Sequence, residues 1–219
     1  MPDALVVSGS GPYADDWHDF PATSARLAAI VEDAGCGVTL TEDVEAALAD
    51  PGQAQLLVVN VGNPAEPRPP ERMTAAATGL RRLLDNGGGL LAVHASATSF
   101  TGMREWPEIL GGRWVRGTTM HPPRDECVVS VTDSDHPVSG GLSDFTVVDE
   151  RYSYLETGAD ITVLHDHHFE DTRHPLVWAR DAGPGRVVYD ALGHDTASYD
   201  APGHRELLDR AIRWLLHEL

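Results

Sequence analysis

The sequence predicts an α/β fold built on a doubly wound, mostly parallel sheet with helices on both faces and an irregular, β-rich second half. Short apolar runs alternate with segments whose apolar residues recur at helical spacing, which is typical of parallel strands joined by crossover helices. The runs ALVVSGSG and QLLVVNVG are almost continuously apolar, as strands covered on both faces should be. A length of 219 residues suffices for one sizeable core, so we expect a single domain over residues 1–219.

The elements of the first half have clear start and stop signals. The helix expected over residues 22–35 begins at Thr and Ser and stops at Gly, and the next strand is rich in β-branched residues. A proline-rich loop, NPAEPRPPE, precedes the third helix. In chain order we expect strands over 4–11, 37–43, 55–62 and 89–95, and helices over 22–35, 44–50 and 78–89.

The second half is less regular and richer in strands. Several of its strands follow one another through short turns, which favours antiparallel pairing. We expect strands over 127–133, 144–155, 161–167, 175–180 and 185–193, a short helix over 103–112, and a final helix over 204–219 whose apolar face holds Leu207, Leu208, Ile212, Leu215 and Leu216.

Composition excludes several classes of function. The net charge of −18 disfavours nucleic acid as a partner, because phosphate backbones need a basic surface. All basic residues are Arg, which excludes a Schiff-base or P-loop lysine. Cys36 and Cys127 are too few and too far apart for a disulfide framework or a metal knuckle. No apolar run approaches the roughly 20 residues that cross a bilayer, and no secretory signal is visible, so we expect a cytosolic protein without a membrane partner.

His94 is the strongest candidate for chemistry. It follows the strand in GGGLLAVHASATSF, at a bend where α/β enzymes often hold a nucleophile. Ligands of open parallel sheets bind beyond the carboxyl ends of the strands, and the helix expected after His94 would offer free N–H groups to an anion. The alternative is a buried imidazole satisfied by one hydrogen bond.

Two later segments supply further candidates at strand ends. His194 follows a late strand and precedes Asp195, a carboxylate that can fix the tautomer of an imidazole. Asp149 and Glu150 end another strand, and neighbouring strand residues point to opposite faces, so only one carboxylate can enter the cleft. Glu150 in the cleft would suit a general acid/base or a sugar-hydroxyl acceptor. Helix capping for His194, and surface ion pairs for the carboxylates, are the alternatives.

A metal site is a weaker expectation. His165 and His167 lie in HDHHFEDTRHP and share one face of a strand, a spacing that can chelate zinc if a third ligand comes from elsewhere. The candidate ligands for a divalent metal such as zinc are His94, His194, His165 and His167, and the cofactor is otherwise unknown.

The remaining candidates are expected to contact a small-molecule substrate. His18 could overhang the cleft, as could His121 with less support, and Trp106 and Trp114 could stack on sugar rings. Trp178 and Trp214 are expected in the core. The substrate-binding candidates are Ser8, Gly9, His18, Asn60, Ser96, Trp106, Asp149, Tyr152 and Asp195.

The order of motifs along the chain resembles the ThuA-like family, named for trehalose utilisation. The motifs span nearly the full chain: SGSG, WHDF, ATSARLAAIVEDAG, VTLTED, NGGGLLAVHASATSF, WPEILGG, DSDHPVSGGL, DERYSYL, HPLVWAR and GRVVYDALGHD. The resemblance implies a flavodoxin-like sheet, similar to that of class I glutamine amidotransferases with their Cys-His-Glu triad. By that similarity His94 stands at the position of the nucleophilic Cys, His194 at that of the triad His, and Asp195 in the segment that carries the acid.

The resemblance also implies a direction for the chemistry. An imidazole does not readily form the thioester that glutamine hydrolysis requires, so glutaminase activity is not expected. Relatives act near oxidised sugars such as 3-keto glycosides made by a partner sugar dehydrogenase, and some bind divalent metal. We therefore expect acid/base chemistry by His94, His194 and Glu150 on a sugar or keto-sugar derivative, as in an isomerase, lyase or hydrolase. The alternative is a non-catalytic sugar-binding, sensing or scaffold protein. Edge strands in the second half make a homodimer an open expectation.

Overall fold

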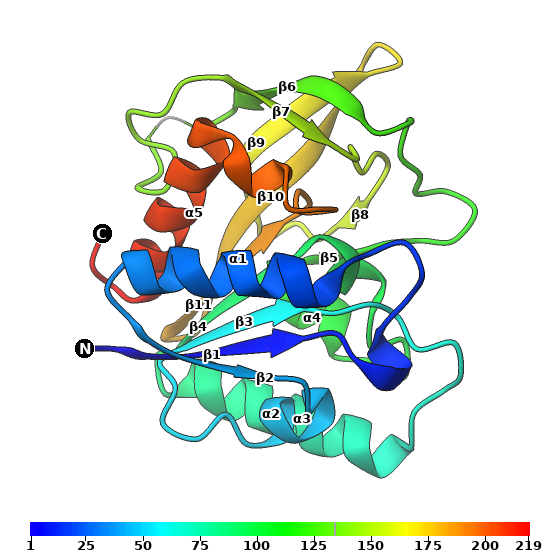
Figure 1. Cartoon of the computed structure of the whole chain (residues 1–219), viewed down its shortest axis with the longest axis vertical. Coiled ribbons are helices and arrows are strands. Elements are labelled where there is room, and N and C mark those ends of the chain that lie inside the picture. The colour runs from blue at the N-terminus through cyan, green and yellow to red at the C-terminus, as the bar shows by residue number, and fades with distance from the viewer. Residues whose placement is uncertain (134) are drawn as a thin grey trace.

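One nine-stranded mixed sheet runs through the protein (Figure 1). The computed structural model describes residues 1–133 and 135–219; Ser134, within the DSDHPVSGGL motif, lies outside the described residues. The strand order is β2-β1-β3-β4-β11-β10-β9-β6-β7. The parallel part comprises β1 (Asp3–Ser8), β2 (Gly37–Thr41), β3 (Leu56–Asn60), β4 (Gly89–Val93) and β11 (Gly185–Asp190).

The remaining strands of this sheet are antiparallel to their neighbours. They extend it from β11 outward to the edge strand β7. These strands are β10 (Thr172–Ala182), β9 (Thr162–Phe169), β6 (Asp125–Val131) and β7 (Phe145–Asp149), and β5 (Gly112–Arg113) pairs with β8 (Glu156–Thr157) in a small second sheet. The predicted α/β class, with a parallel first half and a β-rich second half, is confirmed.

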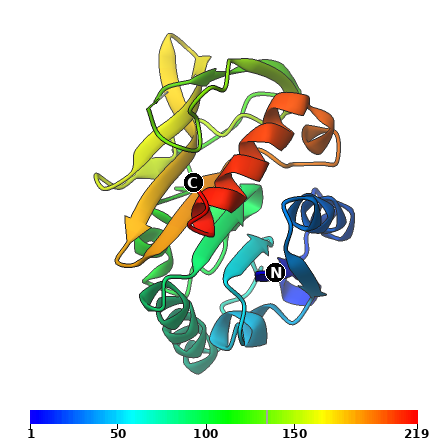
Figure 2. The same cartoon turned by 90° about the vertical axis from the view of Figure 1, so that its left-hand side faces the viewer.

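Helices cover both faces of the parallel strands. Figure 2 shows α1 and α5 on one side of these strands and α3 on the other. The Asp19 carboxylate accepts a hydrogen bond from the Ala22 N–H (3.1 Å) and so fixes the start of α1. The helices are α1 (Phe20–Asp33), α2 (Val44–Ala49), α3 (Pro70–Asp85), α4 (Trp106–Leu110) and α5 (Pro202–Leu215), with short 3-10 turns at Gly11–Tyr13, His94–Thr98 and Ser198–Asp200.

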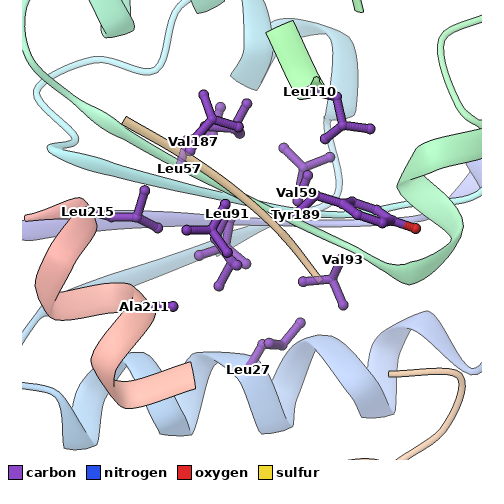
Figure 3. Packing of buried hydrophobic residues seen from close by; sticks show 14 of the residues in the cluster. Leu27, Leu57, Val59, Leu91, Val93, Leu110, Val187, Tyr189, Ala211 and Leu215 are labelled. Atoms are coloured by element: carbon purple, nitrogen blue, oxygen red, sulfur yellow. The ribbon is translucent and has the colours of Figure 1, made fainter. Parts of the chain in front are cut away.

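The core lies between the parallel strands and these helices. Figure 3 shows Leu91 of β4 among Leu27 of α1 and Leu215 of α5, all fully buried. The backbone of Gly89 approaches α5 so closely that an added Cβ would lie 2.7 Å from the Leu215 Cβ. Full burial of each leucine contributes about 1.5–3 kcal/mol, so this layer stabilises the packing of α1 and α5 on the sheet. Trp178 and Trp214 are also buried, as expected.

Two local predictions were wrong. No α-helix follows directly after His94. Instead, the bend at His94 continues into a five-residue 3-10 turn, His94–Thr98. The strand expected over residues 144–155 ends at Asp149, where the carboxylate of that residue bonds the next backbone N–H and turns the chain out of the sheet. Among the described residues, no helix is long and apolar enough to span a membrane.

Candidate active site

A cleft of about 1200 Å³ opens at the carboxyl-end edge of the sheet. Three of its polar side chains, together with the buried His94 beside them, come from four loops that are distant in sequence. His18 lies in the loop between β1 and α1, and His94 follows β4 directly. Glu150 follows β7, and His194 follows β11. These strands run in the same direction, so the fold brings their ends to one edge.

The backbone at His94 is bent, and its buried imidazole lies behind Tyr152 and Glu150, which line the cleft. Its φ is +44°, a conformation that is uncommon for a non-glycine residue and marks strain at functional turns. The ring Nδ1 lies 2.7 Å from the carbonyl oxygen of Ala191 and must donate to it. In the tautomer that carries its proton on Nδ1, the ring accepts a hydrogen bond at Nε2 from the Tyr152 hydroxyl at 3.0 Å.

His18 is oriented in the same manner by a carboxylate. Its Nδ1 lies 2.8 Å from Oδ1 of Asp15, three residues earlier. Its Nε2 is buried and has no hydrogen-bond partner. An imidazole anchored through one nitrogen, with the other nitrogen free and buried, is the usual arrangement of a metal-ligating histidine.

The Glu150 carboxylate lies within 3.6 Å of three imidazoles. Its Oε2 lies 3.4 Å from Nδ1 of His194, 3.6 Å from Nε2 of His94 and 3.6 Å from Nε2 of His121. Nδ1 of His194 is buried without a hydrogen-bond partner. The rings of His94 and His194 are 5.5 Å apart between centroids, and that of His18 lies 5.1 and 4.9 Å from them.

Asp149 holds two of these loops together from beneath the cleft. Its side chain is fully buried. One carboxylate oxygen accepts from the N–H groups of Glu150 (2.7 Å) and His194 (3.2 Å), and the other accepts from Gly193 N–H (2.7 Å). Charge-assisted bonds of this kind are among the strongest in proteins, so Asp149 fixes the positions of both Glu150 and His194.

The proximity of these groups shifts their pKa values. Burial alone would raise the pKa of Glu150, but the adjacent His194 and His94 outweigh burial and hold it well below the ordinary range. The Glu150 carboxylate in turn raises the pKa of His194. Burial, together with the neighbouring His94, lowers the pKa of His18. The cluster therefore combines a firmly ionised carboxylate with a neutral imidazole at His18.

The donor set fits a divalent metal ion. One ligand atom each from His18, His94, Glu150 and His194 lies within 4.8 Å of all the others. Two ligands about 2.1 Å from one tetrahedral ion are about 3.4 Å apart, which is close to the separations around Glu150 Oε2. Three imidazoles and one carboxylate suit borderline ions such as zinc. In residues 1–133 and 135–219, potential ligands gather in a group of three or more only here.

Several predicted site residues lie beneath the cleft. Ser8 is buried and its hydroxyl donates to the Phe20 carbonyl (3.3 Å). An added Cβ on Gly9 would lie 2.5 Å from the Tyr13 carbonyl oxygen, so this glycine permits a close backbone approach. The Asn60 amide is likewise buried, where it bonds two hydroxyls of α1.

The other candidates are divided between the cleft and the interior. Tyr152 lines the cleft, whereas Trp106 is buried and its indole N–H donates to the Ser96 carbonyl (2.9 Å). Asp195 pairs with Arg124 at 2.6 Å outside the cluster. His165 and His167 are buried within β9 and are not brought to the four-residue cluster.

Sequence reasoning missed two residues beside the site. Asp15 anchors His18, and Trp17 is an exposed residue of the cleft lining. A usable signal was present in ADDWHDF, because an Asp three residues before a His can reach its ring nitrogen. His121 received little support from sequence, yet it contributes to the cleft and faces Glu150.

The family comparison agrees with this architecture. The sequence profile of the ThuA family, described as trehalose utilisation, matches residues 3–215. This chain belongs to the ThuA family. The family assignment places the protein in carbohydrate metabolism. No curated protein matches the chain.

Solved structures share the fold of this ThuA-family protein at low sequence identity. A protein from Parabacteroides merdae described as ThuA-like is 21% identical with a TM-score of 0.80, over 99% of this chain and 90% of that one. One from Bacteroides uniformis, also described as ThuA-like, is 18% identical with a TM-score of 0.76, over 98% and 91%. A GMP synthase-like protein from Thermoplasma acidophilum is 15% identical with a TM-score of 0.58, over 97% and 93%. The last similarity confirms the expected amidotransferase-like fold.

Proposed function

We propose that this ThuA-family protein is a metal-assisted enzyme that moves a proton on a sugar or keto-sugar derivative. The observation that carries the proposal is the convergence of His18, His94, Glu150 and His194 in one cluster, three of whose members line the cleft. Two of the imidazoles present buried nitrogen atoms without partners, and such atoms are costly unless a ligand satisfies them. These four residues would hold the metal.

The substrate class follows from the family and from acid/base chemistry. A ketone at C3 of a glycoside acidifies the C2–H bond. Removal of that proton leaves the electron pair as an enolate. Expulsion of the glycosidic oxygen from C1 then gives an unsaturated ketone and an alcohol, which takes up a proton; reprotonation at carbon instead gives an isomer. A bound divalent metal would supply Lewis acidity toward the ketone oxygen.

Other residues of the chain would accept the substrate proton, bind the substrate and orient the cluster. His121 faces the cleft and is partly exposed, and its Nδ1 is anchored on the Pro122 carbonyl (3.0 Å), so its Nε2 is available to accept a proton. The Tyr152 hydroxyl lies 3.0 Å from His94 Nε2 and is released when that nitrogen binds a ligand, so it can donate a hydrogen bond to substrate. Asp15, Ala191 and Asp149 orient the cluster.

Glutaminase chemistry is not part of the proposal. His94 occupies the bend after β4, and the two cysteines, Cys36 and Cys127, are buried elsewhere in the fold. Burial raises the pKa of both thiols, that of Cys127 to about 11, which disfavours a thiolate nucleophile. The cytosolic location, the homodimer and the partner sugar dehydrogenase stay predictions.

The test is turnover of keto sugars with and without the cluster. Purified protein loaded with zinc or manganese is offered 3-keto glycosides, and the loss of substrate and the exchange of the C2 proton with D₂O are followed by NMR. We expect His94→Asn to abolish most of the turnover, because it removes one of the residues that would hold the metal, and Asn tolerates the positive φ of this position better than Ala. Unchanged turnover in this variant would overturn the proposal, and tight sugar binding without any turnover would favour the non-catalytic sugar-binding alternative.

A further inference from the structure

A second hollow adjoins the main cleft and has an unusual charge. It has a volume of about 510 Å³ and shares Thr98, Trp114 and Arg116 with the lining of the cleft. Its charged lining residues are Arg104, Arg113 and Arg116, and no Asp or Glu contributes to the described lining. The positive charge of this lining contrasts with the net charge of −18 of the chain.

Two of these arginines are free to bind a ligand. Most arginines of the described chain pair with carboxylates, as Arg26 does with Asp200 and Arg205 with Asp33. Within residues 1–133 and 135–219, Arg104 and Arg116 make no ion pair and no side-chain hydrogen bond, and both are exposed. Arg113 is paired with Glu156 at 2.7 Å. The hollow thus retains two uncompensated guanidinium groups.

The position of the hollow relates it to the reacting centre. The 3-10 turn begins at His94, which belongs to the cluster of His18, His94, Glu150 and His194, and it ends at Thr98, which lines the hollow. This turn therefore connects the cluster to the hollow. Trp114 lies between the two cavities, and its ring contacts Tyr152 edge-on at 4.7 Å. A ligand with its reacting carbon near Glu150 can therefore extend past Trp114 toward Arg116 and Arg104.

We propose that this hollow is an anion-binding subsite, which takes a carboxylate or phosphate group on the part of the substrate remote from the reacting carbon. Guanidinium groups bind both anions through paired N–H donors. Two uncompensated positive charges in a concave site also concentrate anions locally, against the repulsion of an acidic protein. The inference rests on the proposed function for the location of the reacting centre, and it narrows the substrate to acidic sugar derivatives.

The test compares matched ligands that differ in charge. Binding of glucose, glucuronate, glucose 6-phosphate and inorganic phosphate to the purified protein is measured by calorimetry at low and at physiological ionic strength. We expect at least one of the two acidic sugars to bind at least tenfold tighter than glucose, with a preference that weakens as salt rises. The stronger of the two identifies the anion as carboxylate or phosphate.

The variants separate a specific subsite from general electrostatics. The double variant Arg104→Gln/Arg116→Gln should lose at least tenfold in affinity for the preferred acidic sugar and keep its affinity for glucose. The control Arg26→Gln/Arg205→Gln removes the same charge outside the cleft and should change neither. Equal binding of glucose and both acidic sugars, or unchanged binding in the double variant, would overturn the subsite. Inorganic phosphate binding as tightly as the preferred acidic sugar would overturn it as well.

Metal content separates this inference from the proposed function. The Arg104→Gln/Arg116→Gln variant should retain the metal of the unmodified protein, because neither arginine belongs to the cluster. A protein that binds acidic sugars through these arginines but neither binds metal nor turns over keto sugars would overturn the function and support the subsite. A protein that turns over neutral keto sugars and shows no preference for anions would support the proposed function and overturn the subsite.

Discussion

The carboxylate of Asp149 accepts a hydrogen bond from the backbone N–H of His194, 45 residues later, at 3.2 Å. The same carboxylate bonds the N–H groups of Glu150 and Gly193. One buried side chain therefore ties the ends of β7 and β11 together, although these are the edge and the middle of the sheet. The geometry of the cluster of His18, His94, Glu150 and His194 therefore depends on this connection.

We predict that Asp149→Asn loosens the cluster. The amide replaces an acceptor with a donor that faces a backbone N–H, and a buried N–H left unpaired costs about 1–3 kcal/mol. We expect the free energy of unfolding to fall by about 2–3 kcal/mol and metal affinity to fall about 10–100-fold. Urea denaturation and metal titration measure the two effects. Asp144→Asn is the control, because Asp144 also accepts a backbone N–H (Val131, 2.8 Å) but is exposed; an equal loss of metal affinity in both variants would contradict the role of Asp149.

Removal of the carboxylate behind His18 should weaken metal binding without unfolding the protein. Asp15→Asn leaves an acceptor for Nδ1 of His18 but removes the charge that holds the ring and its tautomer. We expect about a 10–100-fold loss of zinc affinity in competition with a chelator. Asp16→Asn changes the adjacent, exposed carboxylate and should have little effect. The orienting role of Asp15 is wrong if the two variants bind zinc equally.

Gly193 tests the packing beneath His194. Its φ is +113°, and an added Cβ would lie 2.4 Å from the Tyr199 hydroxyl and 2.9 Å from a methyl group of Val93. Gly193→Ala should cost about 2–4 kcal/mol of unfolding free energy, through backbone strain and overpacking. Gly183→Ala, at φ +66° with open space around it, should cost only about 1 kcal/mol. Equal losses of unfolding free energy in Gly193→Ala and Gly183→Ala would contradict a destabilising effect of crowding at Gly193.

Buried His165 makes stability depend on pH. Burial lowers its pKa from 6.5 to about 4, and neither of its ring nitrogens has a partner. Between these pH values the unfolded chain binds the proton and the folded chain does not, so stability is full above about pH 6.5 and falls as the pH drops toward 4, by about 3 kcal/mol. His167, whose pKa burial also lowers to about 4, adds to this loss.

The variant His165→Leu should flatten that pH dependence. Leucine removes the titration and leaves no unpaired polar atom, so we expect a smaller loss of unfolding free energy between pH 6.5 and 4. His168→Gln, which changes the exposed neighbour on β9, should keep the full slope. Identical slopes in unfolding curves of the two variants would contradict the assignment.

The fold was predictable from the sequence because its parallel half follows local rules. The short apolar runs of β1, β3 and β4, rich in Val and Leu and bounded by polar or glycine residues, indicate strands, and the helical spacing of α1 indicates a helix. The strand over residues 144–155 was predicted too long, because the turn after Asp149 depends on a side-chain contact that no local pattern reveals.

The site was predictable only in part. His94 and His194 stand directly after strands, so topology alone brings them to one edge. The roles of Asp15 and His121 depend on the conformations of their loops. Contacts with the rest of the fold determine these conformations, so no local sequence pattern predicts them. Asp149 was expected to contact the substrate; its full burial instead makes it a support for its neighbours.

The most direct measurement is the metal content of the purified protein after incubation with zinc or manganese and removal of excess ion. Elemental analysis should give one ion per chain, and His94→Asn and Glu150→Gln should each reduce this stoichiometry strongly while circular dichroism shows an intact fold. A folded protein that retains no ion, or an ion that survives both substitutions, would contradict a metal centre formed by His18, His94, Glu150 and His194.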